Sequence, residues 1–185
     1  MIIMEAIYFI LMCLWLALPG ALANMMPVFA KNIDFLNYPI DGGRTFRGKR
    51  LFGQNKTFRG FFFGILGAIV IAYFQARLFG LDFFQKIAFI DFSTTNFVLF
   101  GVLIGFGVLF GDLVESFFKR QFDIAPGKPW FPWDQVDLLI GALVFISFIK
   151  IPTWQMIAFF FAVGPLLHLG FNYAGYALGI KKNKW

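Results

Sequence analysis

Residues Phe110 to Asp137 read FGDLVESFFKRQFDIAPGKPWFPWDQVD. This stretch begins inside an apolar run, crosses a short loop rich in Pro and basic residues, and enters a second apolar run. Charged side chains are costly at membrane depth, and those that occur there usually have a function. The acids and bases on both sides of the loop are therefore the first candidates for chemistry.

The composition of the whole chain is that of an integral membrane protein. Of its 185 residues, 59% are hydrophobic, 29 are Phe and only 14% are charged, and the mean hydropathy is +0.75. A soluble domain could not bury so much apolar surface, so lipid must surround most of the chain. The net charge of +6 is typical of basic membrane loops that face lipid headgroups or phosphate, and we expect no nucleic acid partner.

Apolar segments of spanning length recur along the chain. Because a helix satisfies its own backbone hydrogen bonds in lipid, we predict one all-α integral membrane domain over residues 1–185, a bundle of five transmembrane helices. Pro19-Gly20 predicts a break or bend in the first helix. The predicted spans are residues 1–29, 61–79, 97–118, 133–149 and 152–180.

The distribution of basic residues sets the predicted orientation. Thirteen of the sixteen Lys and Arg lie in residues 31–59, 119–132 and 181–184. By the positive-inside rule these segments are cytoplasmic, and the N-terminus is outside. An odd number of spans agrees with this orientation. We therefore predict a multi-pass protein of the cell membrane, with an active site that faces the cytoplasm.

The third and fourth spans bring carboxylates to one membrane depth. Residues three or four apart share a helix face, and in the third span these are Asp112, Glu115 or Ser116, and Lys119. At the start of the fourth span Asp134 and Asp137 share a face in the same way. A loop of about fifteen residues joins the two helix ends, so the carboxylates can converge.

Carboxylates gathered in an apolar environment repel one another, and each costs about 2.5–3.5 kcal/mol at a helix centre. A divalent cation offsets both costs, and Mg²⁺ takes carboxylate oxygens while it keeps water and substrate phosphate as further ligands. We therefore predict a Mg²⁺ site formed by Asp112, Asp134 and Asp137. The alternative is structural, with Asp134 as a helix cap and Asp112 paired to Lys119 or Arg120.

The first polar loop has the composition of a phosphate-binding segment. It reads DGGRTFRGKRLFGQNKTFRG from Asp41 to Gly60. Glycines let the backbone approach phosphate oxygens closely while Lys and Arg neutralise them. Lys56 and Thr57 precede a helix whose N-terminus is a natural anion site. The spacing of a Walker loop is absent, and the alternative is a basic loop that only fixes topology.

With both loops considered, the chain resembles the CDP-archaeol synthase family, membrane cytidylyltransferases related to bacterial CDP-diacylglycerol synthases. Gln135 stands where the diacylglycerol branch has Arg, and no His-Gly-Gly precedes Asp134, which favours the archaeol-type branch. The motifs that carry the resemblance are Asp41-Gly-Gly-Arg44-Thr45, Gly48-Lys49-Arg50, Gly53, Lys56-Thr57-Phe58-Arg59-Gly60, Gly111-Asp112-Leu113, Ser116-Phe117-Phe118-Lys119-Arg120, Pro126-Gly127 and Asp134-Gln135-Val136-Asp137.

The resemblance implies that the phosphate of an isoprenoid glycerol phosphate lipid attacks the α-phosphorus of CTP, giving a CDP-lipid and pyrophosphate in phospholipid biosynthesis. The catalytic residues that it implies are Asp112, Lys119, Arg120, Asp134 and Asp137. The CTP-binding residues that it implies are Asp41, Gly42, Arg44, Lys49, Gly53, Lys56, Thr57, Arg59 and Gly60. We expect the lipid chains in an apolar groove between helices, lined by Phe and Gly.

Three other functions stay open on the sequence. A CDP-diacylglycerol synthase would act on phosphatidic acid instead. A CDP-alcohol phosphotransferase is disfavoured, because Asp41-Gly42 begins its pattern but no GxxxDxxxD helix follows. A transporter or channel would have polar residues along several spans, whereas here they gather at one depth, with His168 and Asn172 as the main exceptions. The glycines of the spans can serve packing within one bundle or between two, so a homodimer is a further possibility.

Overall fold

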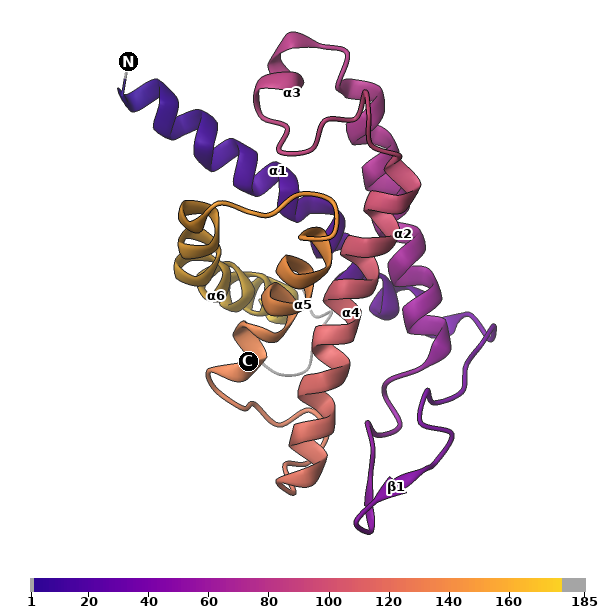
Figure 1. The fold of residues 1–185 in the computed structure, drawn as a ribbon. Helices are drawn as coiled ribbons and strands as arrows, with labels where there is room; N and C mark the ends of the chain where they lie inside the picture. The colour runs from indigo at the N-terminus through magenta and orange to yellow at the C-terminus, as the bar shows by residue number, and fades with distance from the viewer. Residues whose placement is uncertain (1, 178–185) are drawn as a thin grey trace.

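The computed structural model describes residues 2–177, and the basic residues predicted at 181–184 lie outside this range. The chain is helical, as Figure 1 shows, and α4 packs against α1, α2 and α5. The long helices are α1 (Ile2–Phe29), α2 (Phe58–Leu78), α4 (Phe97–Gln121) and α6 (Trp154–Ala177), and the shorter elements are α3 (Asp82–Lys86), α5 (Asp137–Ile146) and the 3-10 turns η1 (Ala30–Asn32) and η2 (Trp133–Gln135).

Within residues 2–177, three helical segments are long and apolar enough to cross a membrane, namely Ile3–Asn32, Phe58–Leu78 and Phe97–Gln121. The helical membrane protein that the sequence predicts is thus confirmed. The predicted fourth span is shorter than expected, because α5 has 10 residues and rises only about 15 Å, half of the roughly 30 Å hydrocarbon layer. The fifth predicted span corresponds to α6, and the count of five crossings stays a prediction.

A short hairpin interrupts the otherwise helical chain. β1 (Thr45–Phe46) pairs antiparallel with β2 (Lys49–Arg50), at the end of the bundle opposite α3 (Figure 1). Arg47 and Gly48 form its turn with φ of 52° and 78°, the left-handed conformation that two-residue hairpin turns require. The all-α prediction missed this element, which lies in the predicted phosphate-binding loop.

Pro19 lies inside α1 without ending it. Proline has no N–H, so the carbonyl of Trp15, four residues earlier, loses its helical partner. Gln75 of α2 supplies the missing donor, since its Nε2 lies 2.6 Å from the Trp15 oxygen. The Gln75 side chain is 2% exposed, and this polar contact therefore joins α1 to α2 inside the apolar bundle.

Replacing Gln75 by Leu is expected to lower the free energy of unfolding by about 1 kcal/mol, because the Trp15 carbonyl then has no donor in an apolar environment. Thermal unfolding of the purified protein in detergent measures the effect. Gln155→Leu is the matched control, since Gln155 is exposed near the start of α6. Equal melting temperatures for the two variants would contradict the assigned role.

Glycines bring α4 into backbone contact with its neighbours. A Cβ on Gly101 would lie 2.6 Å from the Cα of Ile69 in α2. On the other side of α4, a Cβ on Gly111 would overlap the carbonyl oxygen of Asp137, and one on Gly141 would overlap the backbone of α4. The absence of these side chains lets α5 begin directly against α4, and this contact positions Asp137.

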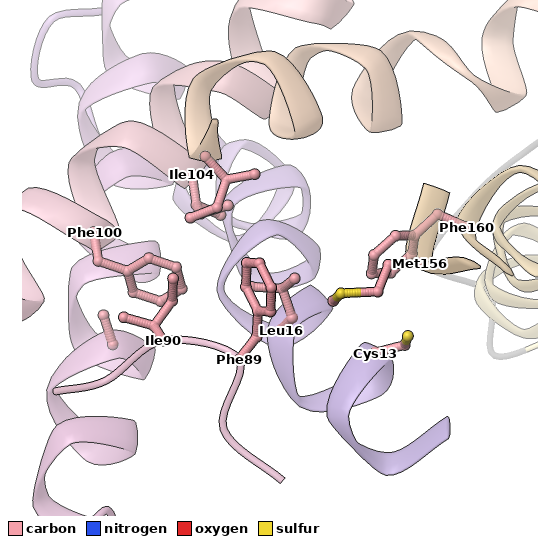
Figure 2. Close-up of a cluster of buried hydrophobic side chains, with 10 residues drawn as sticks. Cys13, Leu16, Phe89, Ile90, Phe100, Ile104, Met156 and Phe160 are labelled. Atoms are coloured by element: carbon pink, nitrogen blue, oxygen red, sulfur yellow. The ribbon is translucent and has the colours of Figure 1, made fainter. Parts of the chain in front are cut away.

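The main apolar core lies where α1, α4, α6 and the loop after α3 meet. Figure 2 shows its side chains converging from these segments. Phe100 and Met156 are almost completely buried. These contacts hold α6 against α1. The labelled members are Cys13, Leu16, Phe89, Ile90, Phe100, Ile104, Met156 and Phe160.

Candidate active site

A polar cavity of about 330 Å³ lies between the C-terminal half of α4, the start of α5 and the segment before α2. Seven of the predicted site residues line it, namely Gly53, Lys56, Asp112, Lys119, Arg120, Asp134 and Asp137. Further polar side chains that the sequence prediction did not assign also line it, namely Asn24, Gln54, Asn55, Glu115, Ser116, Lys128 and Gln135.

Three carboxylates form a cluster in this cavity. Asp112, Glu115 and Asp137 each place one oxygen within 4.8 Å of the others. Asp112 and Glu115 lie one turn apart on α4, and Asp137 reaches them from the first residue of α5. This spacing fits one divalent cation, which takes oxygen ligands at about 2.0–2.6 Å. The Oδ1 atom of Asp137 is buried without a hydrogen-bond partner in the described part of the chain.

Asp134 lies outside this cluster. Its Oδ1 is 2.5 Å from Nζ of Lys119, and its Oδ2 accepts the backbone N–H of Trp130 at 2.8 Å. Lys119 also contacts Glu115 at 2.8 Å. The cluster in the structure therefore contains Glu115 and not Asp134, and Lys119 links these two acids. The three-residue spacing from Asp112 was the sequence signal for Glu115.

The structure contradicts both structural alternatives, namely a helix cap formed by Asp134 and a pair between Asp112 and Lys119 or Arg120. Neither η2 nor α5 has a side-chain cap, so Asp134 does not cap the following helix. Asp112 pairs with Lys56, whose Nζ lies 2.6 Å from both of its oxygens, and not with a base of its own helix. This pair joins the segment before α2 to α4.

The remaining residues of the Asp41–Gly60 loop lie beside the cavity or make contacts that hold the loop in place. Thr57 accepts the N–H of Gly60 at 3.2 Å and caps α2, while Arg59 donates to the Ile33 carbonyl at 2.7 Å. Lys49 donates to the Gln121 carbonyl at 2.7 Å and so holds the hairpin against the end of α4. The exposed residues of the hairpin region include Gly42 and Arg44.

The buried carboxylate of Asp41 holds this loop together. This carboxylate, in a residue only 3% exposed, binds Arg50 at 2.5 Å and the N–H groups of Gly43 and Gly53 at 2.9 and 3.0 Å. Burial opposes ionisation, but these donors lower the pKa of Asp41 to about 2. Asp41 therefore shapes the loop, and its oxygens are already committed.

The contribution of Asp41 to the free energy of unfolding should disappear in acid. Because the pKa of Asp41 falls from 3.8 unfolded to about 2 folded, its contribution of about 2 kcal/mol is present above pH 4 and disappears as the pH falls toward 2. Asp41→Asn should thus be less stable than wild type at pH 6 and equally stable near pH 2. Thermal unfolding across this range measures the difference, with Asp82→Asn in exposed α3 as control. A difference that does not vary with pH would contradict the assignment.

A second cavity, of about 180 Å³ and apolar, lies between α1, α4, α5 and α6. Its walls include Leu14, Gly20, Val108, Leu139 and Phe160. Three residues line both cavities, namely Asn24, Gln135 and Leu138. The polar cavity thus adjoins an apolar one.

Comparison with known proteins gives one family. The family model described as CarS-like, CDP-archaeol synthase, matches residues 5–185. The CDP-archaeol synthase of Thermococcus onnurineus is 38% identical over 95% of this chain and 97% of its own length, and that of Archaeoglobus fulgidus is 37% identical over 95% and 98%. A solved structure, described as an intramembrane enzyme for archaeal membrane lipid biosynthesis, has a TM-score of 0.68 and 28% identity, covering 85% of this chain and 90% of that one.

Proposed function

The chain belongs to the CDP-archaeol synthase family, and from this premise we propose that its polar cavity is where CTP and a lipid phosphate react. The protein is a CTP-using cytidylyltransferase of lipid biosynthesis. A phosphate oxygen of the lipid bonds to the α-phosphorus of CTP while the bond to pyrophosphate breaks. The observation that carries the assignment is the cluster of Asp112, Glu115 and Asp137, set among basic residues beside an apolar cavity.

We propose that Asp112, Glu115 and Asp137 hold Mg²⁺, whose charge would offset the negative charge of the reacting phosphates. The unbonded oxygen of Asp137 supports this assignment. In this proposal Asp134 does not bind the metal, because its carboxylate binds Lys119. Its role is to keep this ammonium group pointed into the cavity beside the carboxylates.

Basic side chains of the same cavity are proposed to bind the triphosphate. Lys56, Lys119 and Arg120 reach it from two different segments, and Gly53, with φ of 94°, lies against Arg120 and presents backbone rather than a side chain. The lipid phosphate is already an anion, so the reaction requires no dedicated general base. Positioning and electrostatics would carry the rate. Asp41, Lys49 and Thr57 act through the shape of the loop, to which Gly42, Arg44, Arg59 and Gly60 also belong.

The apolar cavity is proposed to take the chains of an isoprenoid glycerol phosphate. The positive-inside rule places residues 31–59 and 119–132, and hence the polar cavity, on the cytoplasmic side of the cell membrane, with the N-terminus outside. Gly64, Gly101 and Gly111 are already in close contact within the chain, so they no longer argue for a homodimer.

The test is to incubate the purified protein in detergent with labelled CTP, Mg²⁺ and either digeranylgeranylglycerol phosphate or phosphatidic acid. We expect CDP-lipid and pyrophosphate from the isoprenoid lipid, and none after chelation of the metal. Product from phosphatidic acid alone would move the protein to the diacylglycerol branch. No product from either lipid would contradict the proposed reaction.

A further inference from the structure

Two carboxamide side chains lie on the boundary between the polar and the apolar cavity. Asn24 reaches it from α1 and Gln135 from η2, and both line the two cavities. Gln135 is 8% exposed, and its Oε1 is buried without a hydrogen-bond partner in the part of the chain that the structure describes. A buried amide oxygen that accepts no hydrogen bond is costly. Its position therefore points to a ligand that completes its hydrogen bonding.

The chemistry of a lipid phosphate predicts which of its groups lies at this boundary. The phosphate belongs with the carboxylates and bases, and the hydrocarbon chains belong in the apolar cavity. Between them lies the glycerol unit, in which one oxygen links each chain and can only accept hydrogen bonds. A carboxamide can turn its NH₂ group to the position of its oxygen by rotating its last bond. It is a neutral donor, and so it does not compete with Lys and Arg for the phosphate.

We propose that Gln135 and Asn24 donate hydrogen bonds to the two linkage oxygens of the glycerol unit. This inference rests on the proposed function. Gln135 lies two residues before Asp137, so a lipid held at Gln135 has a fixed distance to the carboxylate cluster. The pair thereby sets how far the lipid phosphate reaches toward the α-phosphorus of CTP. In this proposal both residues bind the lipid, and CTP binding does not depend on them.

Steady-state kinetics with digeranylgeranylglycerol phosphate test the proposal. Gln135→Met keeps the shape of the side chain and removes its donor, and Asn24→Leu does the same on α1. Loss of one neutral hydrogen bond should raise the lipid KM about threefold to tenfold in each variant, with the KM for CTP unchanged. Gln155→Met, on the exposed surface of α6, is the matched control. Thermal unfolding shows whether each variant is folded.

A second ligand separates hydrogen bonding from repacking. Hexadecyl phosphate has a phosphate and a chain but no linkage oxygen, so it should inhibit wild type and Gln135→Met equally, or neither of them. The proposal would be overturned if Gln135→Met weakened binding of this inhibitor as much as binding of the lipid substrate. It would also be overturned if the lipid KM of the variant were unchanged, or if its KM for CTP rose as much as its KM for the lipid. If wild type forms no CDP-lipid, the proposed function fails. If wild type is active and the variant shows one of these patterns, this inference alone fails.

Should Gln135→Met not fold, Asn24→Leu carries the same test from the other helix. Gln135→Asn keeps the carboxamide on a stem one methylene shorter, and we expect its lipid KM to fall between those of wild type and Gln135→Met. A KM for Gln135→Asn above that of Gln135→Met would show that packing, and not the donor, determines lipid affinity.

Discussion

Replacing Asp137 by Asn is expected to reduce CDP-lipid formation at least about a hundredfold, in the range seen when charge stabilisation of a transition state is removed. Asp137 supplies the only carboxylate of the cluster that does not come from α4, and its buried oxygen is free to bind a cation. The substitution therefore removes the negative charge of the ligand that would bridge two helices. Labelled CTP and a Mg²⁺ titration measure the effect, with Asp82→Asn of exposed α3 as the matched control.

The same assay distinguishes the two candidate metal sets. Glu115→Gln should lose activity as strongly as Asp137→Asn and shift the Mg²⁺ requirement upward. Asp134→Asn should cost less and leave the Mg²⁺ requirement unchanged, since Asp134 acts through Lys119. The reverse ranking would favour the set predicted from the sequence, Asp112, Asp134 and Asp137. Turnover of Asp137→Asn within about threefold of wild type would contradict both sets.

Replacing Gly141 by Ala is expected to destabilise the protein by about 3 kcal/mol, at the upper end of overpacking effects. The added methyl group would overlap the backbone of Gly107, which a change of side-chain rotamer cannot relieve. Movement of α5 away from α4 would also displace Asp137, so activity should fall even where the variant is folded.

Gly80→Ala is the matched control for this prediction, because a Cβ there has open space around it. Thermal unfolding in detergent and CDP-lipid formation are measured for both variants. Similar stability and activity of the two would show that α4 and α5 are not as closely packed as described.

The sequence predicted the large-scale organisation because its signals are strong. Runs of apolar residues long enough to cross lipid identified α1, α2 and α4 as spanning helices, and carboxylates in the second half of α4 and at the start of α5 marked the candidate site. The length of α5 was overestimated, since apolar residues continue past Ile146 while the helix does not. Hydropathy reports which residues avoid water, but it does not report where backbone hydrogen bonding stops.

The spacing of residues along the sequence does not determine which side chains meet in the site. Asp134 and Asp137 share a face only if both lie in one α-helix, whereas Asp134 belongs to a 3-10 turn that directs it toward Lys119. Asp41 was assigned to CTP by its motif, and its burial against Arg50 shows a role in shaping the loop. Spacing gave the correct helix face for Glu115, but only the packing of α5 against Gly111 shows which acids meet.

The junction of a polar and an apolar cavity at Leu138 also bears on how a lipid reaches the enzyme. Extraction of an alkyl chain from the bilayer into water costs about 0.8 kcal/mol for each CH₂, so about ten methylenes would cost about 8 kcal/mol. If the apolar cavity takes the chains, as proposed, the hydrocarbon avoids most of this cost when the lipid binds.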